Sequence, residues 1–252
     1  MKKYLIIILC ILHVACKKEI PSSDLQKEKW NGKIKSITTS TFYYDSLKAE
    51  PHLGKLFNKT IREFNTEGNE TTSTFVNEED EVESVKKFSY NSLKLKVVST
   101  EMDEEGNLLM KTVFNYDKKN HLVELLSTDL ITNQVTKQEN IFDDKNNLIS
   151  STTYKNTNEI DFVAKNKYNE KNQMIEECII LPDNTIDYKA ITTYNDKGYV
   201  IRNKGYASDG SQLWELFDDY KLFDKEGNWL LKYIFRDGKP INVVQIQIAY
   251  YP

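Results

Sequence analysis

Cysteine is scarce in this chain of 252 residues, which has only Cys10, Cys16 and Cys178. Cys10 lies in an apolar N-terminal stretch, and Cys16 comes shortly after that stretch ends. If the stretch is removed and Cys16 is modified, Cys178 has no partner, so we expect no intrachain disulfide. Cys178 shares even-numbered positions with the apolar Met174 and Ile180. We therefore expect a small buried side chain there rather than a nucleophile.

Residue patterns typical of metal or catalytic sites are also missing. The chain has three histidines, and outside the N-terminal stretch only His52 and His121 remain, each alone in a predicted loop or turn. There is no His-x-x-x-His, Cys-x-x-Cys, Gly-x-Ser-x-Gly or phosphate-binding glycine loop. The sequence therefore implies no metal, no cofactor and no catalytic residue that can be named.

An excess of basic residues is absent as well. The chain has 34 Lys and Arg against 38 Asp and Glu, and its formal net charge of −4 becomes −6 if Lys2 and Lys3 are removed. Binding to nucleic acid depends on clusters of Lys and Arg that neutralise phosphates. The composition thus argues against nucleic acid as a partner, and attachment to a membrane would have to come from lipid.

No apolar run is long enough to span a bilayer as a helix. The longest, Tyr4 to Leu12, follows Lys2 and Lys3 and is typical of a signal peptide. The next residues, His13-Val14-Ala15-Cys16, resemble a bacterial lipobox. The resemblance implies removal of residues 1–15, diacylation of Cys16 and an outer-membrane lipoprotein of the cell envelope, periplasmic or surface-exposed. A plain signal peptide with an incidental cysteine is the alternative.

Residues 16–30 are polar, contain Ser and Pro, and are expected to form a flexible tether. Residues 31–252 then form a single domain. Within it, Asp45-Ser46-Leu47 resembles the Asp-Ser/Thr-aliphatic O-glycosylation site of Bacteroidetes, with Ser46 as the acceptor. An ordinary turn at this place is the alternative.

A repeated turn motif dominates the domain. An aromatic residue is followed by Asp or Asn, and three positions later by Gly or Asn. The aromatic residues are 26 positions apart at Phe64, Tyr90, Tyr116, Phe142, Tyr168 and Tyr194, and a seventh copy follows after 29 at Phe223. The first polar residue favours a type I turn, and Gly or Asn tolerates positive φ. The predicted turn residues are Asn65, Gly68, Asp103, Gly106, Asp117, Asn120, Asp143, Asn146, Asn169, Asn172, Asn195, Gly198, Asp224 and Gly227.

A second turn about 12 residues after each motif makes every unit a hairpin. No segment has helical periodicity. We therefore predict an all-β fold: an antiparallel meander of about 16 strands, built from 26-residue hairpin repeats and coiled into an open or partly closed barrel-like sheet.

Because 26 is even, equivalent residues should keep one face, and most aromatic and apolar residues have even numbers up to Tyr194. The 29-residue step should then move this apolar face to the odd-numbered Trp229, Leu231, Tyr233 and Phe235. We expect the aromatic face to lie inside the coiled sheet and to be largely shielded.

Over residues 64–235 the turn motif resembles the YD repeat of Rhs-type proteins, and the C-terminal part resembles small Bacteroidetes lipoproteins built from such repeats. The resemblance implies a coiled antiparallel sheet on the cell envelope and no catalytic residues. It favours a non-catalytic, membrane-anchored binding or scaffold module whose partner is a protein or glycan. Two alternatives stay open: a carbohydrate-active hydrolase using unidentified carboxylates, and an immunity-type or chaperone-like partner of a secreted toxin.

Overall fold

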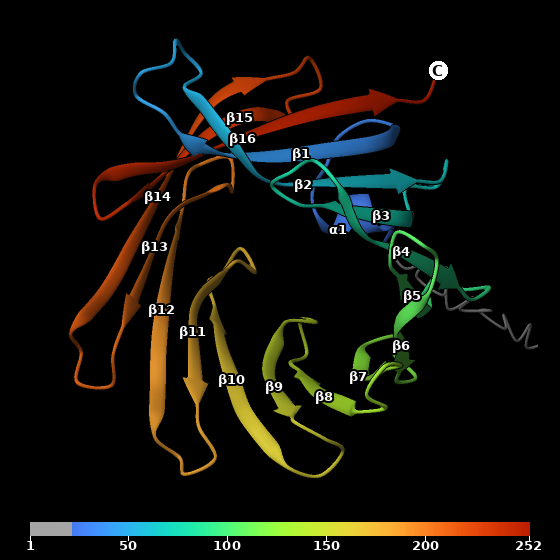
Figure 1. Ribbon diagram of the computed structural model, residues 1–252. Coiled ribbons are helices and arrows are strands. Elements are labelled where there is room, and N and C mark those ends of the chain that lie inside the picture. The colour runs from blue at the N-terminus through green and yellow to red at the C-terminus, as the bar shows by residue number, and fades with distance from the viewer. Residues whose placement is uncertain (1–21) are drawn as a thin grey trace, which may run out of the picture.

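A computed structural model describes residues 22–252 as a closed barrel of sixteen antiparallel strands with one short helix (Figure 1). The predicted meander is thereby confirmed, and the sheet closes fully because β1 pairs with β16. The elements are α1 (Asp24–Lys27), β1 (Ile34–Tyr44), β2 (Leu53–Phe64), β3 (Glu70–Val76), β4 (Val82–Tyr90), β5 (Lys96–Met102), β6 (Leu108–Tyr116), β7 (Leu122–Asp129), β8 (Val135–Phe142), β9 (Leu148–Tyr154), β10 (Ile160–Tyr168), β11 (Met174–Ile180), β12 (Ile186–Tyr194), β13 (Val200–Tyr206), β14 (Gln212–Phe223), β15 (Trp229–Arg236) and β16 (Lys239–Tyr250).

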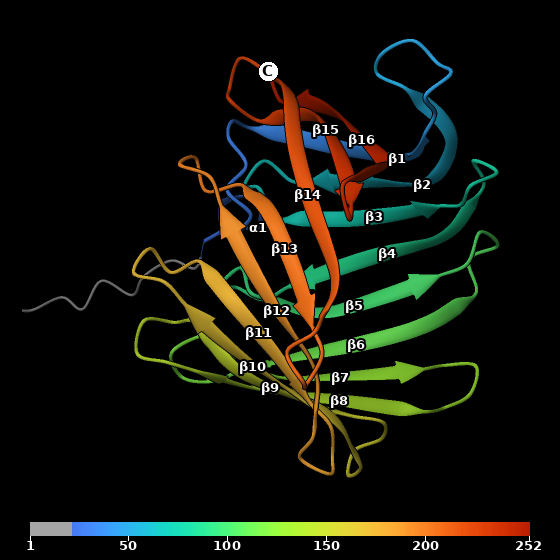
Figure 2. The ribbon, with the colours of Figure 1, turned by 90° about the vertical axis from the view of Figure 1, so that its left-hand side faces the viewer.

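The turns form two rims at opposite ends of the barrel (Figure 2). The α1 rim consists of the turns that follow the even-numbered strands β2 to β14, and α1 lies beside it: 65–69, 91–95, 117–121, 143–147, 169–173, 195–199 and 224–228. The far rim consists of the turns that follow the odd-numbered strands: 45–52, 77–81, 103–107, 130–134, 155–159, 181–185, 207–211 and 237–238.

Bulges beside the turns decide which residues face inward. At the α1 rim, Phe142 pairs with Leu148 while Ile141 pairs with Ser150, so one extra residue separates the two pairs. Such a bulge reverses the parity of the following strand. Another bulge at the far rim restores it, as between Ile179 and Ile180 on β11 where that strand pairs with β12. Two reversals in each 26-residue unit leave equivalent residues of successive units on the same face. Within a unit, however, even-numbered residues do not all share one face.

The inner face is the one that α1 contacts, because α1 lies inside the ring of strands in both side and end views (Figures 1 and 2). Asp24 of α1 accepts a hydrogen bond from Tyr90, so Tyr90 faces inward. The pairing register gives Phe114, Phe162 and Tyr188 the same face. These even-numbered strands follow the predicted parity.

The odd-numbered strands do not follow it. Cys178 pairs with Lys165 and Lys189, and Tyr154 pairs with Lys137, all on the outer face. The prediction that Cys178 points inward is therefore wrong, because the bulge after Tyr168 reverses β11. The sequence reading treated the whole unit as one uninterrupted alternation.

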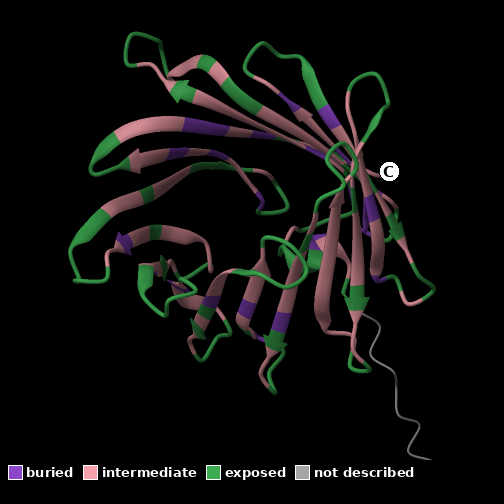
Figure 3. Cartoon of the chain, turned by 60° about the horizontal axis from the view of Figure 1, so that its bottom comes forward, coloured by how far each residue is buried: buried purple, intermediate pink, exposed green. Residues whose placement is uncertain are grey.

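The inner aromatic residues are half-buried rather than shielded. Tyr116, Phe142, Tyr168 and Tyr194 all have intermediate exposure, and Figure 3 shows this class along most of every strand. By contrast Phe64, which α1 covers, is 3% exposed. Shielding of the aromatic face is therefore complete only beneath α1, and the other aromatic residues of the series stay partly exposed.

The segment before β1 closes part of one barrel mouth. Leu25 of α1 is 4% exposed and packs with Ile37, Phe64 and Ile246 on the inner face. A capping box between Ser23 and Gln26 starts the helix. Residues 22–30, part of the segment for which the sequence suggested a flexible tether, therefore pack against the barrel wall. Residues 16–21 lie outside the described part of the chain.

A second apolar cluster lies on the outer face. Leu231, Tyr233 and Val243 are buried there beneath Tyr44 and Leu53. The prediction that Leu231 and Tyr233 continue the aromatic inner face is wrong. The register between β14 and β15 shifts on both sides of residue 222, which accommodates the 29-residue spacing of this repeat. As a result Lys232, not Leu231, lies on the inner face.

Candidate functional site

The α1 rim is built from one repeated turn. In the turn that starts at Asn195, Oδ1 accepts hydrogen bonds from the backbone N–H groups of Lys197 at 3.1 Å and Tyr199 at 3.0 Å, and Gly198 has φ of 83°. Asn65, Asp117, Asp143, Asn169 and Asp224 accept in the same way, and Gly68, Asn120, Asn146, Asn172 and Gly227 have positive φ. Asp103 and Gly106 form a similar turn on the far rim.

Tyrosines link adjacent strands below this rim. The hydroxyl of Tyr194 donates a hydrogen bond to the carbonyl of Met174, at the start of the strand before its own. The same 20-residue step joins Tyr90 to Glu70, Tyr116 to Lys96, Tyr168 to Leu148 and Tyr220 to Val200. Tyr220 lies 26 residues after Tyr194 and continues the tyrosine series, whereas the turn motif itself shifts to Phe223. Phe142 alone interrupts the series between Tyr90 and Tyr220.

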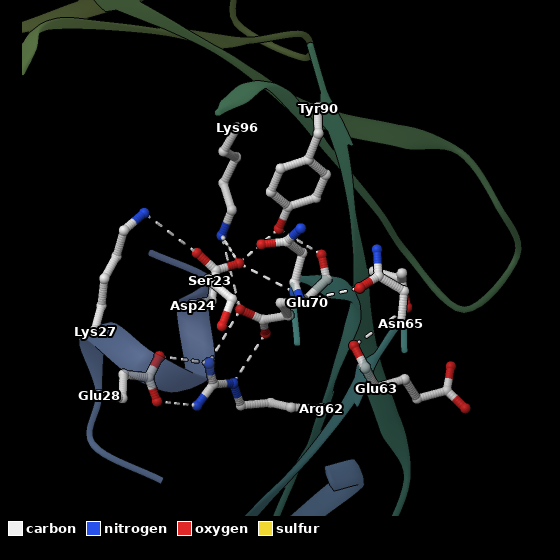
Figure 4. A network of polar contacts seen from close by, with 12 residues as sticks. Ser23, Asp24, Lys27, Glu28, Arg62, Glu63, Asn65, Glu70, Tyr90 and Lys96 are labelled. Atoms are coloured by element: carbon white, nitrogen blue, oxygen red, sulfur yellow. Dashed lines mark hydrogen bonds and ion pairs between the residues drawn. The ribbon is translucent and has the colours of Figure 1, made fainter. Parts of the chain in front are cut away.

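A polar network joins α1 to the inner wall (Figure 4). Arg62 on β2 forms hydrogen bonds with Glu28 at 2.6 and 2.7 Å and with Glu70 at 2.9 and 3.1 Å. Asp24 accepts from the hydroxyl of Tyr90 at 2.6 Å and from the backbone N–H of Glu70 at 3.0 Å. Lys96 lies 3.7 Å from the carboxylates of Asp24 and Glu70.

The network fixes the charges of its members. Burial opposes the charge of Arg62, but the hydrogen bonds with Glu28 and Glu70 outweigh it and raise its pKa. Burial also opposes ionisation of Asp24, yet the hydroxyl of Tyr90 and the charge of Lys96 hold the pKa of Asp24 below its usual value. Burial and the Asp24 carboxylate raise the pKa of Tyr90. The network therefore holds Asp24 and Arg62 in their charged forms beside the neutral phenol of Tyr90, an arrangement suited to seating α1.

A pocket of about 640 Å³ opens between α1 and the β6–β9 wall. Its lining is Ser22, Lys27, Leu95, Tyr116, Lys119, Asn120, His121, Leu122, Phe142 and Asn146. The ring of His121 stacks on Phe142 with centroids 5.0 Å apart and an interplanar angle of 18°. His121 Nδ1 lies 3.0 Å from Asp117 Oδ2, and Nε2 lies 2.7 Å from Asn146 Oδ1. Both ring nitrogens are thus held in place.

From the sequence, His121 is predicted only as an isolated histidine in a turn. An alignment of the repeats could have identified His121. In such an alignment Phe142 stands in place of a tyrosine, and His121 lies 21 residues before Phe142. Elsewhere this spacing joins Tyr199 to Tyr220, and these rings also stack, at 5.1 Å. Tyr220 is covered by Trp229, however, with ring centroids 5.5 Å apart.

The other predicted residues lie apart from this mouth. Ser46 is exposed in a far-rim turn, and Cys16 lies outside the described residues. His52 belongs to the same far-rim turn as Ser46. Within residues 22–252, no group of three or more His, Cys, Asp or Glu side chains is arranged to hold a metal ion. The described part of the chain also contains no helix of sufficient length and apolarity to cross a bilayer.

The two rims differ strongly in charge. The far-rim turns hold thirteen acidic and two basic residues: Asp45, Glu50, Glu78, Glu79, Asp80, Glu81, Asp103, Glu104, Glu105, Glu159, Asp183, Asp209 and Asp237 against Lys48 and Lys155. The α1-rim turns are nearly balanced, with Glu67, Asp117, Asp143, Asp144, Glu170, Asp196, Asp224 and Glu226 against Lys94, Lys118, Lys119, Lys145, Lys171, Lys197 and Lys225. The barrel therefore has one acidic end and one nearly neutral end.

No known protein family matches the sequence, and no curated protein does. Among solved structures, the chain is similar to a porin-like protein from Bacteroides uniformis, with a TM-score of 0.58 and 11% identity over 87% of this chain and 99% of the other. A likeness at this identity shows a shared barrel fold. The structure of TcdB2-TccC3-TEV also matches, with 10% identity over 76% of this chain, 16% of the other chain and a TM-score of 0.20.

Proposed function

We propose that the protein is a non-catalytic binding module of the bacterial cell envelope, anchored through an acylated Cys16 with its α1 rim toward the membrane. The observation that carries this proposal is the seating of α1 at one barrel mouth by Arg62, Glu70 and Tyr90. Cys16 lies six positions before Ser22, so an extended chain between them reaches at most about 20 Å. An anchor on so short a connection keeps the α1 rim near the lipid headgroups.

The charge difference between the rims supports this orientation. An anionic membrane surface repels acidic groups within about a Debye length, roughly 10 Å. The far rim, with its thirteen acidic turn residues, is best placed away from such a surface. The nearly neutral α1 rim can approach it at little electrostatic cost.

The outer face supports a barrel that stands beside the membrane. It carries ion pairs across neighbouring strands, including Lys167 to Glu176 at 2.8 Å and Lys204 to Glu215 at 3.4 Å. A charged side chain on a lipid-facing barrel surface costs about 2–4 kcal/mol at the bilayer midplane. We therefore assign the membrane contact to the lipid chains of Cys16.

A binding role fits the solvent-accessible aromatic and polar inner face, which is available to a protein or glycan partner. Kinship with YD-repeat lipoproteins remains part of this proposal, because it rests on the repeated turn motif. Neither alternative, a hydrolase or a toxin partner, has a specific observation in its favour.

Acylation is tested by metabolic labelling with a fatty-acid analogue. The wild-type protein should be labelled and recovered with the membranes, whereas Cys16→Ala should be unlabelled. Ser22→Ala, at the exposed start of the described chain, is the control and should be labelled like the wild type. Equal labelling of the wild type and Cys16→Ala would contradict the anchor.

A further inference from the structure

We propose that the pocket between α1 and Phe142 binds a small organic anion with a flat apolar body, such as an aromatic carboxylate. The proposal rests on the proposed binding role and assigns it a ligand class, but it does not depend on the lipid anchor. The pocket volume of about 640 Å³ is within the range of small-molecule sites.

The apolar body is expected against the wall made by Leu95, Tyr116, Leu122 and Phe142. Between Tyr90 and Tyr220, Phe142 is the one member of its series without a hydroxyl. Asn140 donates to the carbonyl of Leu122 at 3.0 Å, as Asn166 donates to the carbonyl of Leu148. The Phe142 ring thus offers an apolar surface at a depth where other units present a phenol. His121 covers part of this ring and cannot swing away without breaking its two polar contacts.

The negative charge of the ligand follows from the lysines of the lining. Lys27 and Lys119 both line the pocket. Lys27 has one ion-pair partner, Asp24, at 3.8 Å, and Lys119 has none among residues 22–252. The nearest acid in the same turn, Asp117, is already engaged by the backbone N–H groups of Lys119 and His121. Two ammonium groups at the edge of an apolar pocket select a carboxylate attached to an apolar ring.

Neighbouring units lack this combination. Two units further along the chain, the groove beside β11 and β12 has Lys171 at the position of Lys119 and Gln173 at the position of His121. Its tyrosine, Tyr194, donates its hydroxyl to Met174, and α1 contributes no residue to its lining. Lys171 therefore offers a matched control for Lys119.

The test uses the full acylated chain in phosphatidylcholine nanodiscs and calorimetric titration with 2-naphthoate. The neutral 2-naphthalenemethanol is the probe without charge. We expect saturable binding of naphthoate, about five-fold weaker binding to Lys119→Gln and unchanged binding to Lys171→Gln. Phe142→Leu, which keeps the pocket apolar but removes the ring, should also weaken binding, and the alcohol should bind more weakly than the acid.

Three results would overturn the site: no saturable binding, equal loss in Lys119→Gln and Lys171→Gln, or equal affinity for the acid and the alcohol. Melting curves of each variant identify any that fails to fold, and Lys119→Gln changes only an exposed side chain. The unacylated Cys16→Ala protein should bind naphthoate like the wild type. A wild-type protein that is not acylated but binds naphthoate would contradict only the membrane anchor. A wild-type protein that is acylated but does not bind naphthoate would contradict only this site.

Discussion

The hydroxyl of Tyr194 donates a 2.7 Å hydrogen bond to the main-chain carbonyl of Met174, twenty residues earlier in the chain. The bond joins two adjacent strands, since β12 carries the tyrosine and β11 carries the carbonyl at its first residue. The bulge lies at the turn between β10 and β11. A carbonyl at the start of a strand near a bulge lacks a regular ladder partner, and the phenol satisfies it. The repeated tyrosine is therefore explained by the repeated bulge.

Removing one such hydroxyl should be measurable. Tyr168→Phe should lower the free energy of unfolding by about 0.5–1.5 kcal/mol, the net value of one hydrogen bond. The reverse change, Phe142→Tyr, should be neutral or stabilising, because Leu122 offers the carbonyl that Leu148 offers to Tyr168. Denaturant melts of both variants measure this. A loss in Phe142→Tyr as large as that in Tyr168→Phe would contradict the explanation.

The rim turns depend on positive φ. Gly198 has φ of 83°, and an added Cβ would also lie 3.3 Å from Gln173 Nε2. Gly198→Val should therefore cost about 1–3 kcal/mol. Lys189→Val, on the outer face of the preceding strand, is the control and should be nearly neutral. Equal shifts in the melting temperature would refute the role of the turn.

Burial by α1 determines how much an inner aromatic residue contributes to the free energy of unfolding. Phe64 is 3% exposed, so Phe64→Ala should cost about 3–5 kcal/mol, as for a fully buried aromatic. Phe142 is half-buried, and Phe142→Ala should cost about half as much. Chemical denaturation of both variants measures the two losses of unfolding free energy. Equal losses would mean that the inner face is shielded throughout.

The sequence was sufficient for the strands because the turn signal, Asp or Asn followed by Gly or Asn, is local and repeats. It was insufficient for the faces, because a bulge is set by hydrogen bonding between strands and its extra residue has no characteristic residue type. This is why Cys178 and Leu231 were assigned to the wrong side. The Ser23–Gln26 capping box was readable, but the burial of Leu25 depends on Ile37, Phe64 and Ile246, which only closure of the barrel brings together.

Acid should loosen α1. The pKa of Asp24 lies below its usual value of 3.8 in the folded chain, so its ionised form stabilises the fold above pH 4, and this contribution is lost as the pH falls through the lowered pKa. At pH 7, Asp24→Asn should lower the unfolding free energy by about 1–3 kcal/mol. The difference from the wild type should shrink in acid. Asp196→Asn, in an exposed turn, should show neither effect, and a pH-independent difference for Asp24→Asn would contradict the role of its charge.

Quenching by spin-labelled lipids measures the orientation of the barrel on the membrane. A fluorophore is placed at Lys118→Cys on the α1 rim or at Glu104→Cys on the far rim, in the acylated chain carrying Cys178→Ser, on vesicles with headgroup nitroxide lipids. We expect strong quenching at position 118 and little at position 104, since the two rims lie at opposite ends of the barrel. Equal quenching at both positions, or stronger quenching at position 104, would contradict it.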